Sequence, residues 1–328
     1  MPDLLAVPSP YADDRVVDLA DWVEINTFFK DDRSVSREDL ATSLVRAHGV
    51  NRGHGLNRQH ALDLAGDVFN ELADRIQACS GHDEADTATA YPFYLNDVET
   101  TLQVKPEYRP NGNFGLVYRF LLFVSRGDMA SKARVLEGVD PTRVFERLCA
   151  DVLFNYWGGG KLCGSLVFGT AKKKAKHNSS FESNINHLCA EVGEGAGRKP
   201  TARSPGAGDA KLDVVVWRKF GDDRAGGLVG FAQCKTGIHW KEHLSKLQPR
   251  NFCAQFMLEP FVVDPVRLYL VPYRIEETQW PDHSRHAGIL FDRCRITQYS
   301  GGVNRETLRE CKSWAVAAER KRKRNSDQ

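Results

Sequence analysis

The chain has 328 residues, of which 41% are hydrophobic and 27% charged, a composition that excludes an intrinsically disordered protein and predicts a globular one. Its 45 basic and 43 acidic residues leave a net charge of +2, which neither indicates nor excludes a polyanionic partner. The apolar runs are shorter than the roughly 20 residues that cross a bilayer. The first fifteen residues carry acids and prolines where a signal peptide would carry basic residues and an apolar core. We therefore expect a cytoplasmic protein with no membrane partner.

The eight cysteines are scattered along the chain, with no CxxC pair and no nearby CxxH. This spacing argues against a structural zinc site. Most of the cysteines stand beside apolar residues, as buried free cysteines do. We therefore predict reduced thiols, as expected in the cytoplasm.

For residues 1–135 we predict a mostly helical N-terminal module that recognises a partner, a DNA feature or a signal. Apolar spacing predicts helices over 16–30 and 57–79, and Ser36 precedes two acids as a helix N-cap would. Between residues 91 and 124 the pattern changes to short strand-like pieces, YPFYL and GLVYRFLLFV, separated by a turn sequence.

The second half predicts a mixed α/β (α+β) core over residues 140–312, followed by a basic, disordered tail over 313–328 that ends in Arg320–Arg324. Helices are expected over 141–157 and 180–192. The expected strands cover residues 162–168, 212–217, 228–234, 266–272 and 288–293.

An acid, an amide and a lysine are expected to meet in this core. Asp213 opens the apolar strand VVVW, and Gln233 and Lys235 stand at the end of the strand LVGFAQCK. Residues two apart on a strand face the same side, so Gln233 and Lys235 project together, and a hairpin would bring them beside Asp213. Each residue alone is more often a turn residue or a solvated strand end. Together, inside a buried hairpin, they would cost stability unless they serve a function.

Such a cluster suits metal-assisted hydrolysis of a phosphodiester. Mg²⁺ prefers oxygen ligands from one or two carboxylates and keeps several waters. The metal activates a water molecule, and an adjacent lysine can orient that water and stabilise the developing negative charge.

At these residues the sequence resembles the PD-(D/E)xK nuclease superfamily, in its restriction-endonuclease-like, Mrr-type branch. That branch carries an FE pair on a helix, a GDxxxDVV strand and a strand ending in QCK. The matching pieces are Phe181-Glu182, residues 208–215 (GDAKLDVV) and Gln233-Cys234-Lys235, within roughly 175–275. The resemblance implies a mixed sheet flanked by helices, and it makes 140–312 a nuclease domain.

The resemblance also implies a role for each matching residue. Asp213 would be the central metal ligand, Glu182 would be the helical acid, and the backbone carbonyl of Cys234 would complete the coordination of Mg²⁺, for which Mn²⁺ could substitute. Lys235 would be the catalytic lysine. Gln233 stands where many relatives have Glu or Asp, so metal binding would depend more on Glu182 and on the DNA phosphate.

The helical acid has two alternatives. Glu182 lies about 100° around the predicted helix from Phe181, and Glu191 flanks the same face on the other side. A second FE pair, Phe145-Glu146, opens another helical pattern further upstream of Asp213. The FE match and the shorter distance along the chain favour Glu182.

DNA contacts are predicted at basic residues near this site, since phosphates are bound by such charges. A solvated loop is an equal alternative for the lysine run of residues 172–176, which precedes the predicted helix with Phe181-Glu182. Asp209 is more readily a turn residue than a ligand. The predicted DNA-binding residues are Lys172, Lys173, Lys174, Lys176, Lys211 and Lys241.

The sequence thus predicts a Mg²⁺-dependent DNA endonuclease, of a branch that often serves in restriction or anti-phage defence. No GxxxxGK[ST] loop is present, so the chain is not expected to hydrolyse ATP by itself. The defence context allows a helicase, an ATPase or another defence subunit as a partner. The resemblance also allows a homo-oligomer. The alternatives are a non-catalytic nucleic-acid-binding protein with the nuclease fold, and a structural subunit of a defence complex.

Overall fold

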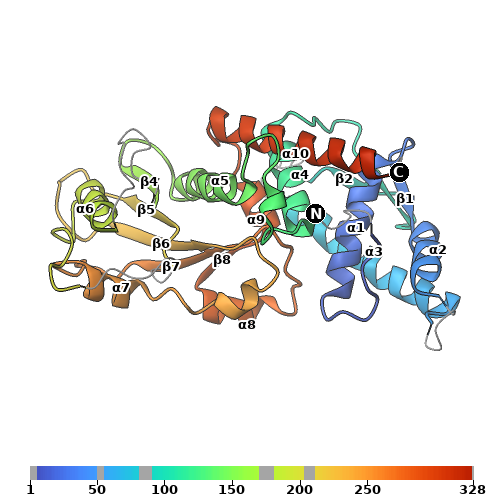
Figure 1. The fold of residues 1–328 in the computed structure, drawn as a ribbon, viewed down its shortest axis with the longest axis horizontal. Coiled ribbons are helices and arrows are strands. Elements are labelled where there is room, and N and C mark those ends of the chain that lie inside the picture. Colours follow the sequence, from blue (N-terminus) through green and yellow to red (C-terminus); the bar gives the residue numbers. More distant parts are fainter. Residues whose placement is uncertain (1–5, 50–54, 81–90, 170–180, 203–210, 327–328) are drawn as a thin grey trace.

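The structure is a computed structural model that describes residues 6–49, 55–80, 91–169, 181–202 and 211–326. It contains a three-stranded and a five-stranded sheet among helices, which confirms the predicted mixed α/β class and the helical N-terminal region (Figure 1). None of the described helices is both long and apolar enough to cross a membrane.

The N-terminal part is built from helices around a small antiparallel sheet in the order β1-β3-β2. Ser36 caps α2 as predicted, since its side chain accepts from the Asp39 amide at 3.0 Å. The elements of this part are α1 (Arg15–Phe29), β1 (Ser34–Ser36), α2 (Arg37–His48), α3 (Arg58–Ser80), β2 (Phe93–Leu95), β3 (Thr101–Val104) and α4 (Asn113–Arg126).

The segment GLVYRFLLFV is a helix, so its prediction as strand is wrong. It forms the middle of α4, in which every residue from Gly115 to Ser125 is buried. A helix buried on all sides shows no amphipathic period, and a short apolar run does not distinguish it from a buried strand.

The five-stranded sheet has the order β4-β5-β6-β7-β8. The pairs β4–β5 and β5–β6 are antiparallel, whereas the pairs β6–β7 and β7–β8 are parallel. The elements are α5 (Pro141–Tyr156), β4 (Cys163–Val167), α6 (Phe181–Val192), β5 (Val214–Arg218), β6 (Leu228–Cys234), α7 (Pro249–Phe256), β7 (Val266–Leu270), α8 (Trp280–Ala287), β8 (Ile289–Phe291), α9 (Arg293–Gln298) and α10 (Arg305–Ser326), with short 3-10 helices at Lys132–Arg134 and Trp240–His243.

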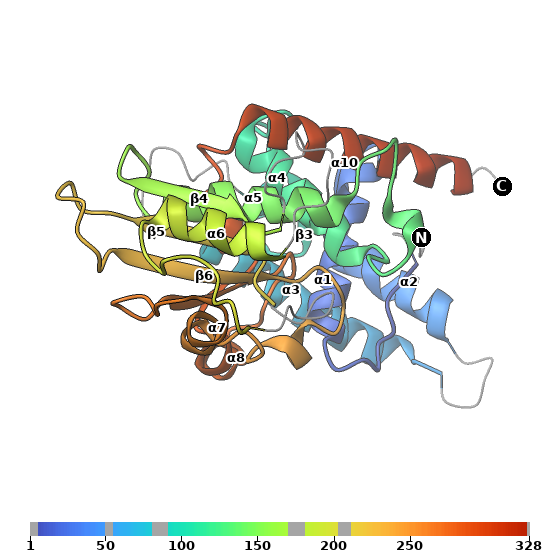
Figure 2. The same cartoon turned by 60° about the vertical axis from the view of Figure 1, so that its left-hand side comes forward.

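Helices cover both faces of this sheet. Val214, Val216 and Ala232 face α5 and share one apolar core with the N-terminal helices. Val215 and Phe231 point the other way, to the core under α6 and α7. Figure 2 views the sheet from the side that carries α6. The predicted boundary between residues 135 and 140 therefore crosses a continuous core.

The predicted disordered tail is helical through Ser326. Residues 313–326 belong to α10, which packs on α4 and α5. Trp314 is fully buried, and its indole N–H donates to the Arg134 carbonyl at 2.8 Å. The apolar residues among the charges of this segment bury one helix face, and this burial holds the helix in place.

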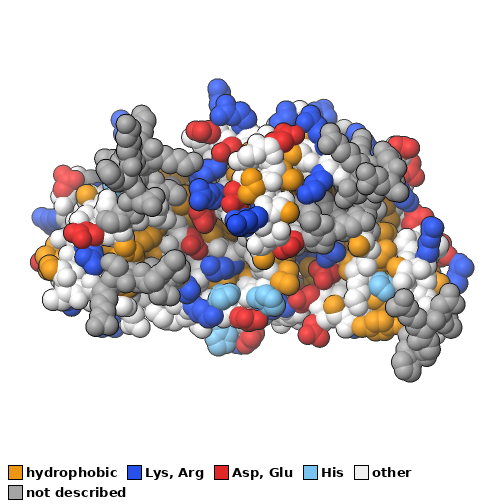
Figure 3. All heavy atoms as spheres, viewed as in Figure 1, with side chains coloured by type: hydrophobic (Ala, Val, Ile, Leu, Met, Phe, Trp, Pro, Cys, Tyr) orange, Lys and Arg blue, Asp and Glu red, His pale blue; other side chains and the backbone are white. Residues whose placement is uncertain are grey.

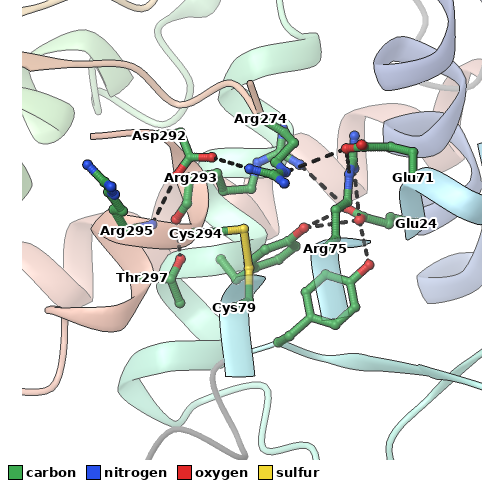
Figure 4. Close-up of a disulfide and its surroundings, with 12 residues drawn as sticks. Glu24, Glu71, Arg75, Cys79, Arg274, Asp292, Arg293, Cys294, Arg295 and Thr297 are labelled. Carbon is green, nitrogen blue, oxygen red and sulfur yellow. Dashed lines mark hydrogen bonds and ion pairs between the residues drawn. A yellow bond between two sulfur atoms is a disulfide. The ribbon is translucent and has the colours of Figure 1, made fainter. Parts of the chain in front are cut away.

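One disulfide corrects the prediction of reduced thiols. Cys79 of α3 is bonded to Cys294 of α9 across 215 residues, and the six other cysteines are free (Figure 4). Local sequence around either cysteine cannot indicate a pairing that only the packing of α3 against α9 creates.

A buried ionic network lies beside this disulfide (Figure 4). Arg75 and Arg293, both fully buried, donate to Asp21 at 2.7 and 2.8 Å and to Glu24 at 2.9 and 3.4 Å. Burial alone would raise the pKa of Asp21, but the two guanidinium groups hold it well below its usual value. The network ties the N-terminal helices to α9.

Candidate functional site

The hairpin of β5 and β6 brings Asp213 and Lys235 together. Asp213 stands just before β5, and its amide donates to the Ala232 carbonyl at 2.9 Å. Its carboxylate oxygen Oδ2 accepts from the Cys234 amide at 2.8 Å. The Lys235 ammonium nitrogen lies 4.0 Å from the same oxygen. The hairpin register thus creates the acid–lysine pair that the strand pattern predicts.

Gln233 is an anomaly in this hairpin. It lies in β6 beside Tyr269 of β7 and is fully buried. Neither the oxygen nor the nitrogen of its amide has a hydrogen-bond partner within the described part of the chain. An unsatisfied buried polar group costs about 1–3 kcal/mol, so the amide is expected to serve a bound water, metal ion or substrate.

We therefore expect Gln233→Met to raise stability while it removes function. Methionine fills a similar volume without an unsatisfied amide, so the free energy of unfolding should rise by about 1–2 kcal/mol. Urea unfolding without divalent metal measures this change. Exposed Gln248 is the control, and Gln248→Met should change little. A lower unfolding midpoint for Gln233→Met would show that the amide is satisfied.

Glu146 of α5 lies near the acid–lysine pair. Helix α5 packs along β4 and β5, and it places Glu146 within electrostatic reach of Asp213 and Lys235. Burial, and then the Asp213 carboxylate, raise the pKa of Glu146 to about 7. Asp213 responds in the same way, because burial raises its pKa against the opposing effect of Lys235. Two desolvated carboxyl groups therefore face one lysine.

Glu182 has other surroundings, and its role as the helical acid stays a prediction. Its side chain is 59% exposed and forms an ion pair with Arg198 at 3.1 Å. Helix α6 buries Ile185, Leu188 and Val192 in the core on the opposite face of the sheet from α5. Glu191 is exposed on the same helix, 3.8 Å from His187. The upstream acid Glu146, which the distance along the chain disfavours, is the one whose pKa Asp213 and Lys235 affect.

Cys234 separates Gln233 from Lys235 and points to the α5 face of the sheet. Its thiol is buried next to Cys149, and burial raises the pKa of that thiol well above its usual value. The group is therefore an inert thiol. Metal binding by the Cys234 backbone carbonyl stays a prediction.

The predicted DNA-binding lysines have different surroundings. Lys211 stands two residues before Asp213 and acts electrostatically on its carboxyl group. The Lys241 ammonium is held by the Asp14 carboxylate at 2.7 and 2.9 Å and by Gln279 at 3.2 Å, so it is engaged by the chain itself. The remaining predicted residues, Lys172, Lys173, Lys174 and Lys176, lie outside the described residues, as does Asp209.

Two residues of the site had no signal in the sequence. His243, after β6, has a buried Nδ1 without a hydrogen-bond partner in the described chain. Burial and then Lys246, Lys235 and Lys211 lower its pKa, so its imidazole is neutral among these cations. Arg143 of α5 is exposed and acts on Glu146. A single His or Arg among many charges forms no recognisable motif.

The residues at the site fit a magnesium ion. Within the described residues, no group of three or more His, Cys, Asp and Glu side chains could hold a metal. Mg²⁺ needs only one or two carboxylates and completes its shell with water. Glu146 and Asp213 supply two carboxyl groups, and burial raises the pKa of both, which a bound cation would oppose. The set does not fit zinc, which prefers His and Cys ligands.

One cavity lies away from these residues. It has a volume of about 520 Å³ and is lined by residues of α6, the glycine-rich segment 193–197 and the segment 259–262. None of Glu146, Asp213, Gln233 or Lys235 lines it. The candidate site therefore lies outside this cavity, at the end of the β5–β6 hairpin.

Comparisons with protein-family models, with curated proteins and with solved structures find no match to this chain.

Proposed function

We propose that this protein is a metal-dependent DNA endonuclease whose active site consists of Glu146, Asp213, Gln233 and Lys235. The observation that carries the proposal is that two carboxyl groups with raised pKa lie within electrostatic reach of one lysine at the end of a hairpin, whose second strand also carries an unsatisfied buried amide. A purely structural ion pair needs neither the second acid nor the unpaired amide.

Each side chain has a distinct role in this proposal. A bound Mg²⁺ supplies Lewis-acid activation of water and neutralises charge on the phosphate. Asp213 and Glu146 hold the cation, and the Cys234 amide fixes the orientation of the Asp213 carboxylate. Lys235, whose backbone N–H donates a hydrogen bond to the Leu270 carbonyl at 3.0 Å, orients the attacking water and stabilises the negative charge of the transition state.

The hydrolysis of supercoiled plasmid tests the proposal directly. We expect wild-type protein to nick or linearise plasmid with Mg²⁺ or Mn²⁺, and excess EDTA to abolish the reaction. Asp213→Asn should remove activity with either metal, because it deletes the central charged ligand. Cleavage that persists in EDTA, or in Asp213→Asn, would contradict the proposed chemistry.

The wider context is part of the same proposal. A nuclease of this kind, without an ATP-binding loop of its own, is suited to restriction or anti-phage defence beside a helicase or ATPase. Copurification with an ATPase, and DNA cleavage stimulated by ATP only in its presence, would support this assignment. Cleavage at full rate by the isolated chain would count against a required partner.

A non-catalytic DNA-binding protein is the second candidate, and Gln233 is the observation that favours it. An amide in place of a carboxylate leaves the site with two acids instead of three. In that case wild-type protein would shift DNA in a gel without cutting it under any metal, and Gln233→Glu would gain cleavage. These two results together would identify a site that has lost its activity.

A further inference from the structure

Helix α10 carries a line of cations on its solvent side. Arg305, Arg309, Lys312 and Arg320 are all exposed. At 100° per residue they fall within an arc of about 80°, opposite the buried face that contains Trp314. The sequence continues this line at Lys323. No acidic residue lies within this arc, whereas an ordinary solvated helix face carries charges of both signs.

Two of the three acids of α10 pair with other helices, and the third, Glu306, is exposed beside Arg305, whereas the cations of the line are mostly free. Glu310 forms an ion pair with Arg147 of α5, and Glu319 pairs with Arg119 of α4 at 3.1 Å. Within the described residues, Arg305, Arg309 and Lys312 form no ion pair, and Arg320 has only the exposed Glu137 at 3.2 Å. The charge of the line is therefore directed outward and largely uncompensated.

The start of α10 is anchored on α5, the helix that carries Glu146 of the proposed active site. Asp151 of α5 accepts hydrogen bonds from Thr307 at 2.9 Å and from the Asn304 amide at 3.2 Å, which anchors the start of α10 on α5. Exposed Arg143 lies between Glu146 and Arg147 around the surface of α5. Figure 3 shows blue side chains along the upper edge of the molecule, over α10, and across the middle of the same face.

We propose that this cationic line binds the phosphate backbone of duplex DNA outside the cleaved segment. The proposal rests on the nuclease function but concerns binding, not chemistry. Helix α10 is about 33 Å long, close to one turn of duplex. A row of cations spaced by about 6, 5 and 12 Å along the helix, of which Arg320 alone has an ion pair within the described residues, complements the dense linear charge of DNA and requires no base contacts.

The test measures the salt dependence of DNA binding in full-length protein. A fluorescent 25-base-pair duplex is titrated in EDTA, which prevents cleavage, at several salt concentrations. The variant combines Arg305→Gln, Arg309→Gln and Lys312→Gln. The control removes three exposed cations of the β5–β6 hairpin, α7 and α8, with the same change in net charge, by Arg224→Gln, Arg250→Gln and Arg285→Gln.

We expect the α10 variant to lower the slope of log K against log salt by about 2–3, because each lost phosphate contact contributes about 0.9. The control should keep the wild-type slope, and both variants should keep the wild-type melting temperature. Equal slopes for the α10 variant and the control would overturn the proposal. So would a loss confined to phosphatidylserine vesicles, which would assign the line to a membrane surface.

The outcomes for binding and for cleavage are separable. If wild-type protein cuts plasmid but the α10 variant binds DNA with an unchanged salt slope, only the proposed role of the cationic line is overturned. Wild-type protein whose binding depends on the line but which never cuts would overturn the nuclease function alone.

Discussion

Replacement of Lys235 by methionine is expected to lower the rate of plasmid cleavage by about 10²–10³-fold at saturating Mg²⁺. Its ammonium group is placed 4.0 Å from Asp213, where it can orient water and stabilise the transition state, and loss of one such preorganised donor has an effect of this size. Methionine keeps most of the packing of the lysine stem. Single-turnover cleavage separates this chemical effect from DNA binding.

Lys241→Met is the matched control for Lys235→Met. Both residues are lysines after β6, but the ammonium group of Lys241 is held by Asp14 and Gln279. Its replacement should leave the single-turnover rate near that of wild type. An equal loss of rate in both variants would show that Lys235 acts through general charge and not through its place beside Asp213.

Glu146→Gln is expected to abolish metal-dependent cleavage, whereas Glu182→Gln should leave it near the wild-type rate. The reason is position: Glu146 acts on Asp213 and Lys235, whereas Glu182 is exposed and paired with Arg198. Glutamine preserves shape and removes only the charge that a cation requires. Both variants are compared in the same plasmid assay. Loss of cleavage in Glu182→Gln alone would reverse the assignment.

The raised pKa of Glu146, about 7, adds a pH dependence to this prediction. Only ionised Glu146 binds the cation, so the apparent Mg²⁺ affinity should rise as the pH increases through about 7. Without metal, Glu146 of the folded protein keeps a proton that the same residue loses in the unfolded chain near the ordinary glutamate pKa of 4.5. Stability should therefore fall between about pH 4.5 and 7, by an amount on the order of 3 kcal/mol.

Glu146→Gln should lack this loss of stability. Urea unfolding of wild type and variant in EDTA, at pH 5 and pH 8, checks the difference. Wild type is expected to be less stable than the variant at pH 8, and saturating Mg²⁺ should remove the deficit in wild type only. Parallel pH profiles of the two proteins would show that Glu146 is not desolvated beside Asp213.

Predictions from the sequence succeeded where the contacts are local. The alternation of β6 and a short connection to β5 suffice to bring Lys235 beside Asp213. The predictions from the sequence failed where packing between distant segments determines the structure. The middle of α4 was predicted as strand because burial on all sides removed its helical period. The acid of α6 was preferred because it is nearer Asp213 along the chain, whereas Asp213 and Lys235 act electrostatically on Glu146 of α5 and Glu182 is paired with Arg198.

The sequence by itself thus determined the hairpin, the strand positions of Asp213, Gln233 and Lys235, and the α/β class, because the strand period and turn chemistry act over a few residues. The tertiary structure decided that Glu146 faces Asp213, that Lys241 is held by Asp14, and that Cys79 meets Cys294. It also left cations of α10 facing solvent while Glu310 and Glu319 of the same helix are paired. These contacts join segments far apart in the chain, and only the packing of helices on the sheet brings them together.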